Sequence, residues 1–332
     1  MKRVKLGIVG TGIIWERVHK PVLKKLSDRF EIAAFCATSD KSREKVFNEY
    51  PNLPFFKDYN ELLKSSFIDT AVILTPLSMN SRVALAALDS GKDVIMEKPM
   101  AVNFSSGLEL IKKEEKSGKR VFILEQSVYL KQADEFLKII TSGKIGDLVA
   151  YEKLCHGFIH TNTEKEEDYG NTKWRINPDF PLGTLLDSGI HEIAMLSKIF
   201  GNPQSVFSTG NKFRQEYGEY DFVLSIFEYS NKAKGSFSHS FFLGDSRNYF
   251  NVRGTEGIAY FDNDSIKIEM KNGYKETIPV NDDDIHERTW SLFADCFEQN
   301  NLPYYTTKVS LGDLKTMEAI GRSLKERTMV AI

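Results

Sequence analysis

Short apolar runs alternate with helical stretches through the first 126 residues of this chain, and this alternation limits the fold more than any other feature. Each run is rich in aliphatic residues, as expected of a strand that is buried on both faces. Strands that alternate with helices predict right-handed crossovers and a doubly wound parallel sheet. The predicted strands are residues 5–10, 31–37, 69–75, 93–99 and 120–126.

The second half of the chain follows a different pattern. Stretches rich in aromatic and β-branched residues succeed one another and are joined by turns of Gly, Asn and Asp, which predicts a mostly antiparallel sheet. Because 332 residues exceed what one hydrophobic core usually spans, we expect two domains. The predicted strands are 147–160, 221–230, 233–243, 247–255, 257–262 and 265–270, and the predicted closing helices are 287–299 and 310–327.

Composition and charge narrow the class of protein. The formal net charge is −2 and the pI is about 6.4, so no overall basic field favours nucleic acid or an anionic membrane surface. Cys36, Cys155 and Cys296 form no CxxC pair, which argues against a disulfide framework or a zinc site. No apolar stretch reaches the length of a membrane span or a signal sequence. We expect a cytoplasmic protein whose partner is a small molecule or another protein.

The first chemical motif is the turn after the first predicted strand, Gly10-Thr11-Gly12, which Ile13 and Ile14 follow. In a dinucleotide-binding unit, the first glycine makes the tight turn and the second lets the backbone approach the pyrophosphate at the helix N-terminus. Trp15 stands where this pattern usually has a third small residue. The turn predicts NAD or NADP as the cofactor.

The end of the second predicted strand bears on the choice between these two cofactors. An acidic residue there would bind the ribose 2′-hydroxyl of NAD, but the strand ends in Ala37-Thr38-Ser39. Thr38 and Ser39, with positive charge from Lys41 or Arg43, fit a 2′-phosphate and favour NADP. An ordinary solvated turn and helix start is the open alternative.

Two further strands end in residues that can act on a cofactor or substrate, Thr75-Pro76-Leu77 and Glu97-Lys98-Pro99. In an open α/β sheet, ligands bind outside the carboxyl ends of the strands. An ammonium at Lys98 would lie near the nicotinamide and a substrate hydroxyl, where it stabilises a developing alkoxide. The alternative is a surface ion pair at the end of a strand, which contributes little energy.

Gly10-Thr11-Gly12, Thr75-Pro76, the stretch ALAALDSGKDVIM and above all Glu97-Lys98-Pro99 resemble the glucose-fructose oxidoreductase/inositol 2-dehydrogenase family, known as Gfo/Idh/MocA. The resemblance spans essentially the whole chain. It implies a dinucleotide-binding Rossmann domain over residues 1–127. Over residues 128–332 it implies an α+β domain with a large, mostly antiparallel open sheet for substrate binding and oligomerisation. The last helix is expected to pack back on the Rossmann domain.

The stretch 183–196 carries the expected partner of Lys98. Asp187 and His191 are four residues apart, which places both on one face of a helical turn. They resemble the family's Asp-x-x-x-His motif, which implies His191 as the general acid/base and Asp187 as its neighbour in the pocket. Proton transfer by such an imidazole typically contributes about 10²- to 10⁴-fold in rate. The alternative is a helix-capping aspartate beside a hydrogen-bonded core histidine.

The resemblance implies further contacts. Trp174-Arg175 matches a pair that precedes this motif in many members, although an aromatic packing anchor beside a surface arginine is the alternative. Tyr129 is expected near the nicotinamide or, alternatively, in the core. The expected cofactor contacts are Gly10, Thr11, Gly12, Ile13, Ile14, Thr38, Ser39, Arg43, Thr75, Pro76, Leu77, Asn80, Glu97, Lys98 and Gln126, and the expected substrate contacts are Lys98, Tyr129, Trp174, Arg175, Asp187 and His191.

Some residues depart from the family pattern or receive no role. Asn80 stands where many members have a histidine, and Pro181-Leu182-Gly183 stands where many have glycines. The acidic loop 160–173 is expected to be mobile or to fold over a site. No metal is predicted. The remaining histidines show no metal-ligand spacing and are assigned no role: His19, His156, His160, His239 and His286.

The sequence thus predicts an NAD(P)-dependent oxidoreductase that moves a hydride between nicotinamide and a carbinol carbon of a sugar, sugar derivative or cyclitol. Lys98 would orient the hydroxyl, His191 would move its proton, and Asp187 would orient the substrate or tune the histidine. Two alternatives stay open: a non-catalytic NAD(P)-binding regulator and an NAD-dependent glycoside hydrolase relative. We expect a homodimer or homotetramer through the C-terminal sheet, because large uncovered sheets seldom remain in water.

Overall fold

The computed structural model describes residues 3–159, 169–244 and 249–332. The chain divides into two compact units. Unit 1 comprises Met1–Glu125 and Asp284–Leu311, and unit 2 comprises Gln126–Asp283 and Gly312–Ile332. The predicted roles of the two parts, cofactor binding in the first and substrate binding in the second, stay predictions.

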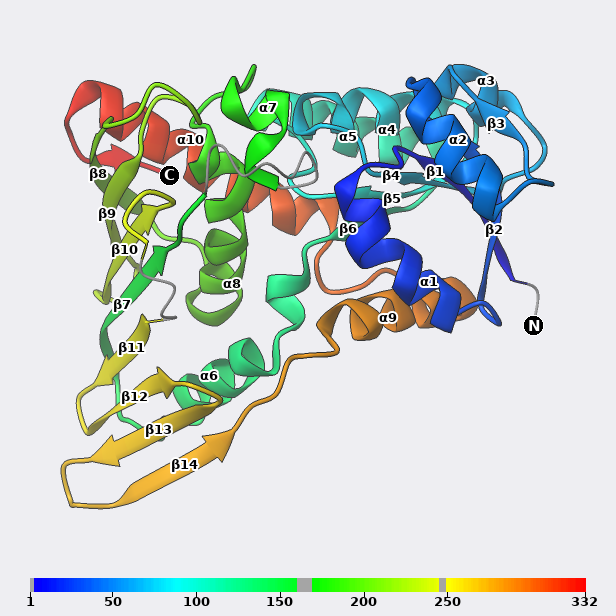
Figure 1. Ribbon diagram of the computed structural model, residues 1–332. Coiled ribbons are helices and arrows are strands. Elements are labelled where there is room, and N and C mark those ends of the chain that lie inside the picture. Colours follow the sequence, from blue (N-terminus) through cyan, green and yellow to red (C-terminus); the bar gives the residue numbers. More distant parts are fainter. Residues whose placement is uncertain (1–2, 160–168, 245–248) are drawn as a thin grey trace. The chain divides into compact units, whose positions relative to one another are not determined.

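Within the described residues, unit 1 is built on a sheet of six parallel strands in the order β3-β2-β1-β4-β5-β6 (Figure 1). The predicted doubly wound parallel sheet is therefore confirmed. The strand order reverses between β1 and β4, and in such sheets ligands bind outside the carboxyl ends of the strands at this point. The strands are β1 (Val4–Val9), β2 (Phe30–Cys36), β3 (Phe55–Phe56), β4 (Thr70–Ile73), β5 (Asp93–Glu97) and β6 (Val121–Leu124).

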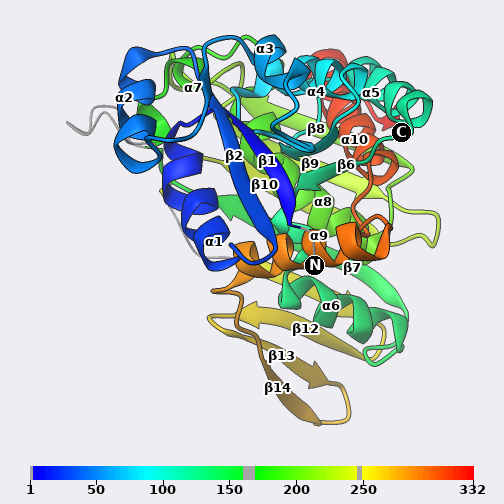
Figure 2. The ribbon, with the colours of Figure 1, turned by 90° about the vertical axis from the view of Figure 1, so that its right-hand side faces the viewer.

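Helices cover both faces of this sheet. α1 and α9 lie together on one face, and α4 and α5 lie together on the other (Figures 1 and 2). Two rings of α9 pack onto the strands, Trp290 against Phe30 and Phe297 against Phe122. A π-helical turn, Trp15–His19, precedes α1. The helices are α1 (Lys20–Lys25), α2 (Asp40–Glu49), α3 (Tyr59–Lys64), α4 (Asn80–Asp89), α5 (Phe104–Ser117) and α9 (Ile285–Gln299).

Unit 2, as far as the chain is described, is built on a nine-stranded sheet in the order β14-β13-β12-β11-β7-β10-β9-β8-β15. β7 and β10 are parallel, and the other described neighbours are antiparallel, which confirms the predicted mostly antiparallel sheet. The strands are β7 (Leu148–His156), β8 (Ser205–Asn211), β9 (Phe222–Glu228), β10 (Lys234–Ser240), β11 (Tyr249–Gly254), β12 (Gly257–Asp262), β13 (Ser265–Met270), β14 (Lys275–Pro279) and β15 (Val330–Ala331).

Helices α6, α8 and α10 pack on one face of this sheet. A buried row on that face runs across the neighbouring strands β8, β9, β10, β7 and β11 and consists of Ser208, Ser225, Phe237, Lys153 and Phe250. Phe136 of α6 contacts Phe250, and Ser323 of α10 accepts a hydrogen bond from the Ser208 N–H. Phe200 of α8 stacks on Tyr151. The helices are α6 (Lys131–Thr141), α7 (Lys173–Ile176), α8 (Ile190–Phe200) and α10 (Thr307–Glu326).

Several elements have no clear signal in the sequence. β14 is an edge strand that carries Lys275 and Glu276, and charged residues are typical of sheet edges. β3 and β15 have two residues each, which is too short for a periodic pattern. Of the predicted acidic loop, residues 160–168 lie outside the described residues, and a 3₁₀ turn, Tyr169–Asn171, precedes α7.

Candidate active site

The turn after β1 has the geometry of a phosphate-binding turn. Gly10 has a φ of +101°, and a Cβ at this position would lie 2.5 Å from the Leu74 carbonyl oxygen, so glycine is required. A Cβ on Gly12 would meet nothing within 4 Å, which leaves this side of the turn open. Ile13 and Ile14 begin the helix, where backbone N–H groups have no partner within the helix.

Thr11 gives a further sign of a ligand at this turn. Its side chain is buried, and its Oγ1 has no hydrogen-bond partner among the described residues. A buried hydroxyl left in this way costs on the order of 1–3 kcal/mol, whereas a phosphate oxygen would accept a hydrogen bond from it. The donors and the open backbone therefore fit a dinucleotide phosphate.

Trp15 occupies the place of the third small residue. It is buried, and its ring centroid lies 5.6 Å from that of Phe35 on β2. The π-helical turn begins at this residue. A bulky ring thus fills the contact between helix and strand that a small residue makes in the usual pattern.

The end of β2 leads directly into α2. Ser39 is the N-cap of α2, since its Oγ accepts a hydrogen bond from the Ser42 N–H at 3.1 Å. Thr38, Ser39 and Arg43 are all exposed. Their contacts with a cofactor stay predictions, and the Ser39 hydroxyl already has a role within the chain.

Asn80 joins the carboxyl ends of β4 and β5. Its Nδ2 donates to the carbonyls of Glu97 and Pro99 at 3.1 and 3.3 Å, and its Oδ1 accepts from Thr75 Oγ1 at 3.0 Å. These two carbonyls flank Lys98, so the buried Asn80 side chain holds the backbone on which Lys98 stands. The contacts support a positioning role for Asn80, and its predicted contact with a cofactor stays a prediction.

The same edge of the sheet includes the residues after β4. Pro76 is the N-cap of the 3₁₀ turn Leu77–Met79, and the Leu77 side chain is buried. The peptide bond between Lys98 and Pro99 is cis. The predicted cofactor contacts of Pro76 and Leu77 stay predictions.

Both oxygens of the Glu97 carboxylate have partners. Oε2 accepts from the Lys98 backbone N–H at 3.2 Å, and Oε1 lies 2.9 Å from Nε2 of the buried His19. The other ring nitrogen of His19 lies 3.1 Å from Nε1 of Trp290 on α9. Sequence reasoning gave His19 no role and did not consider Trp290. No local pattern could reveal a contact between residues 271 positions apart.

In unit 2, Asp187 is paired with Arg175. Asp187 lies in a π-helical turn, Leu185–Gly189, and Arg175 Nε donates to its Oδ2 at 2.7 Å. The Arg175 guanidinium lies 4.0 Å from the centroid of the Trp174 ring and 5.3 Å from that of Tyr169. The rings thus support a guanidinium that neutralises Asp187. The predicted substrate contacts of these residues stay predictions.

His191 is the second residue of α8. Its carbonyl accepts a hydrogen bond from Ser127 Oγ at 2.7 Å. Ser127 belongs to the 3₁₀ turn Gln126–Tyr129, which follows β6 in the chain. Gln126 and Tyr129 therefore lie in a turn rather than in a strand, and this turn is fastened to the backbone of α8 at His191. The sequence gave no sign of the part that Ser127 plays.

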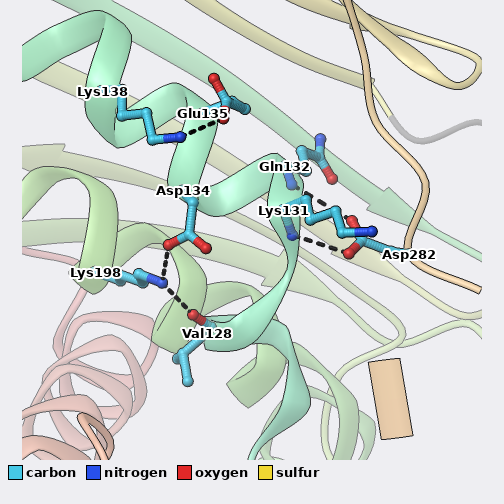
Figure 3. Close-up of polar contacts among 8 residues, drawn as sticks. All are labelled: Val128, Lys131, Gln132, Asp134, Glu135, Lys138, Lys198 and Asp282. Carbon is cyan, nitrogen blue, oxygen red and sulfur yellow. Dashed lines mark hydrogen bonds and ion pairs between the residues drawn. The ribbon is translucent and has the colours of Figure 1, made fainter. Parts of the chain in front are cut away.

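A second set of contacts fastens the same turn. Figure 3 shows Lys198 of α8, which donates to the Val128 carbonyl and pairs with Asp134 of α6. Asp282 accepts hydrogen bonds from the first two backbone N–H groups of α6, at 2.9 and 3.4 Å. The turn that bears Gln126 and Tyr129 is thus supported by two helices.

The chain before Asp187 makes a tight turn. Leu182 and Gly183 have φ values of +65° and +50°, which is the left-handed region that favours glycine. A Cβ on Gly183 would lie 2.1 Å from the Tyr217 carbonyl oxygen. This backbone explains why glycines suit the position. Leu182 replaces one of them, and its side chain is buried.

A buried polar cluster lies between α8 and the sheet. Lys153 pairs with Glu192 at 3.1 Å, and burial raises the pKa of the Cys155 thiol well above its ordinary value. Burial lowers the pKa of His239 to about 3. A Cβ on Gly189 would lie 3.3 Å from the His239 ring, so this neutral imidazole packs directly against the π-helical turn.

Within residues 3–159, 169–244 and 249–332, no group of three or more His, Cys, Asp or Glu side chains is arranged to hold a metal ion. Among the helices of this part of the chain, none combines the length and the apolar character that crossing a membrane requires.

Two family models match the chain. Residues 4–125 match the model of an oxidoreductase family with an NAD-binding Rossmann fold, and residues 135–260 match the Gfo/Idh/MocA C-terminal domain. The fold and the turn after β1 thus define an oxidoreductase that binds a nicotinamide dinucleotide. The chain belongs to the Gfo/Idh/MocA family, and the resemblance seen in the sequence is confirmed.

Known proteins share this organisation. An uncharacterized protein of Saccharomyces cerevisiae is 30% identical over 79% of this chain and 75% of its own length. The trans-1,2-dihydrobenzene-1,2-diol dehydrogenase of Mus musculus is 28% identical over 77% of this chain and 74% of its own. The crystal structure of a Thermotoga maritima oxidoreductase has a TM-score of 0.90 and 28% identity, and covers 99% of this chain and 98% of its own.

Proposed function

We propose that this protein is an NAD(P)-dependent dehydrogenase or reductase that acts on a carbinol carbon of a sugar, sugar derivative or cyclitol. The observation that carries the proposal is the end of β5, where Glu97 and Asn80 hold the backbone of Lys98 at the ligand-binding edge of the sheet. Family membership supports the oxidoreductase class. The mouse relative is named as the dehydrogenase of a cyclic 1,2-diol, which is also a secondary alcohol.

Bound NAD(P) would supply the hydride acceptor or donor at nicotinamide C4. The turn at residues 10–14 would hold its pyrophosphate through backbone N–H groups and the Thr11 hydroxyl. The Lys98 ammonium would orient the reacting hydroxyl and stabilise negative charge on its oxygen. His191 would accept the hydroxyl proton in the oxidative direction and return it in the reductive direction.

The pairing with Arg175 changes what Asp187 is expected to do. Arg175 donates to the Asp187 carboxylate at 2.7 Å, so the two side chains form a charged hydrogen-bonding pair. We therefore assign Asp187 and Arg175 to orienting substrate hydroxyls rather than to proton transfer.

A panel of polyols, aldoses, uronates, cyclitols and cyclic diols, each tested with NAD and with NADP, checks this proposal. We expect absorbance at the reduced-nicotinamide band to rise with at least one substrate class. Substrate turnover without net cofactor reduction would instead favour a glycoside hydrolase. Tight cofactor binding without turnover of any substrate, in a protein with Lys98 and His191 intact, would favour the regulator.

Cofactor binding at the turn has its own test. Thr11→Val removes the buried hydroxyl with little change of shape, so we expect the Kd for the dinucleotide to rise by roughly tenfold, as for one lost hydrogen bond to a charged group. Thr70→Val is the matched control, because Thr70 Oγ1 is also buried without a described partner but lies within β4. Equal cofactor affinity in the two variants would contradict the assigned role of Thr11.

For the choice of cofactor we propose NADP, because β2 ends without a carboxylate and the exposed Arg43 follows it. Arg43→Ala should lower kcat/KM for NADP by about tenfold and leave that for NAD within about twofold, since one exposed charge pair with a phosphate is lost. The loss of kcat/KM in Arg43→Ala relative to the wild type, measured with each cofactor, decides the preference. An equal loss with both cofactors would remove this argument for NADP.

We also propose a homodimer or homotetramer through the sheet face of unit 2 that α6, α8 and α10 do not cover. Ile226 and Tyr249 lie on that face by strand register and are 43% and 40% exposed. Light scattering should give a multiple of the chain mass, and Ile226→Glu should shift it towards one chain. A monomeric wild-type protein at micromolar concentration would rule this out. The cytoplasmic location stays a prediction.

A further inference from the structure

The contacts of His19 determine which ring nitrogen carries its proton. Trp290 Nε1 is a donor only, and it lies 3.1 Å from His19 Nδ1. Nδ1 must therefore be the unprotonated acceptor. The proton is on Nε2, which lies 2.9 Å from Glu97 Oε1 and donates to it. This geometry selects the tautomer that carries its proton on Nε2.

Packing holds both His19 and Trp290 in place. His19 and Trp290 are buried to 1% and 0% exposure. His19 lies in the π-helical turn Trp15–His19, and Trp290 lies on α9, which packs against the same sheet through Phe30. The ring planes of His19 and Trp290 meet at 68° with centroids 5.8 Å apart. The orientation of the imidazole is therefore set by packing on both sides.

Glu97 carries this orientation to Lys98. Its Oε1 is bonded to His19, and its Oε2 accepts from the Lys98 backbone N–H at 3.2 Å. The carboxylate thus links the imidazole of His19 to the backbone of Lys98.

We propose that Trp290 and His19 form a relay of positioning residues that orients Glu97 and, through it, Lys98. The cluster is more than a hydrogen-bonded core, because its last member bonds the backbone of the residue to which we assign the chemistry. The proposal rests on the proposed function only for its effect on turnover. The orientation of Lys98 by His19 can be measured without turnover.

Gln is the informative replacement for His19. Its amide offers an acceptor and a donor spaced like Nδ1 and Nε2–H of the neutral imidazole, so His19→Gln should keep kcat within about threefold. His19→Leu removes both groups and should lower kcat by about 10- to 100-fold, in the range of lost positioning, with the cofactor Kd changed less than twofold. Combined with Lys98→Met, His19→Leu should add less than a further twofold.

Two measurements do not depend on activity. The ring ¹⁵N shifts of His19 in the full-length protein should show a protonated Nε2 and an unprotonated Nδ1, and Trp290→Phe should shift the Nδ1 signal. After reductive ¹³C-methylation, the signal of Lys98, assigned with Lys98→Arg, should move in His19→Leu and stay in place in His19→Gln. Phe122→Leu controls for lost packing between β6 and α9 and should lower stability while leaving kcat and the Lys98 signal unchanged.

The outcomes separate the relay from the function. An unchanged Lys98 signal in His19→Leu, or a protonated Nδ1 in the wild type, overturns the relay even if Lys98 is catalytic. If Lys98→Met keeps the wild-type kcat, the proposed function fails, while a moved Lys98 signal still establishes the relay. If His19→Leu does not fold, Trp290→Phe and His19→Gln decide the matter through the same signals.

Discussion

Two π-helical turns of the described chain, Trp15–His19 in unit 1 and Leu185–Gly189 in unit 2, hold a carboxylate in different ways. In the first, the His19 imidazole donates a hydrogen bond to Glu97. In the second, the Arg175 guanidinium pairs with Asp187 and cancels its charge. π-Helical turns inside longer helices are frequent at functional sites.

The difference matches the two proposed roles. Glu97 is bonded to the backbone of Lys98 and is proposed to position it, whereas Asp187, paired with Arg175, is proposed to orient substrate hydroxyls. A buried histidine accompanies each turn: His19 uses both ring nitrogens, whereas Nε2 of His239 has no hydrogen-bond partner among the described residues.

The largest effect should come from Lys98, to which we assign the stabilisation of negative charge on the reacting oxygen. We expect Lys98→Met to lower kcat/KM by about 10²- to 10³-fold, the usual cost of losing one group that stabilises an oxyanion, with cofactor affinity nearly unchanged. Steady-state kinetics with the best substrate of the panel measures it. Lys113→Met, which removes a lysine paired with Asp89 on the helices, is the control. Wild-type turnover by Lys98→Met would defeat the assignment.

The pairing of Arg175 with Asp187 in unit 2 should contribute to the free energy of unfolding. Arg175→Met leaves the buried Asp187 carboxylate without its cation and should lower the free energy of unfolding by about 1–3 kcal/mol. Arg175→Met combined with Asp187→Asn should regain part of this loss, because a neutral amide tolerates the same burial better. Chemical denaturation of both variants measures the difference. Additive losses would show that the two side chains act independently.

His239 predicts how stability depends on pH. Burial lowers its pKa to about 3; His156 lowers it further, and Asp187 opposes the shift. The unfolded chain, with a pKa near 6.5, binds the proton first as pH falls. The stability that neutral His239 contributes is therefore present above pH 6.5 and is lost as pH falls towards 3. Between pH 6.5 and 5 the loss should be about 1.5 kcal/mol.

Denaturant unfolding at both pH values, in the wild type and in His239→Leu, isolates the contribution of this histidine from that of the carboxylates. The variant should lack that part of the pH dependence. An identical slope in the two proteins would show that the pKa of His239 is not lowered in the fold.

The smallest effect should come from the support of unit 2 drawn in Figure 3. Asp282→Ala removes the carboxylate that accepts from the first N–H groups of α6 and should cost about 1 kcal/mol of stability. Glu135→Ala removes an exposed pair with Lys138 on the same helix and should cost less than about 0.5 kcal/mol. Thermal unfolding of the two variants gives the comparison, and equal values would deny Asp282 its capping role.

Some features of the structure could be predicted from the sequence, and others could not. The strand and helix alternation predicted the parallel sheet because the period of apolar residues is a local property. β14 was not predicted, because an edge strand mixes charged and apolar residues. Asn80 was recognised as a departure from the family pattern. Its contacts with the carbonyls of Glu97 and Pro99 could be found only in the structure, because they depend on how close the ends of β4 and β5 lie.

The sequence by itself determined the alternation of strands and helices in unit 1, the glycine turn after β1 and the position of Lys98 at the end of β5. Each of these depends on neighbours within a few residues. Only the tertiary structure decided that Trp290 meets His19 across 271 positions and that Ser127 meets His191 across 64. Those partners are chosen by packing, and packing determines which nitrogen of His19 carries a proton.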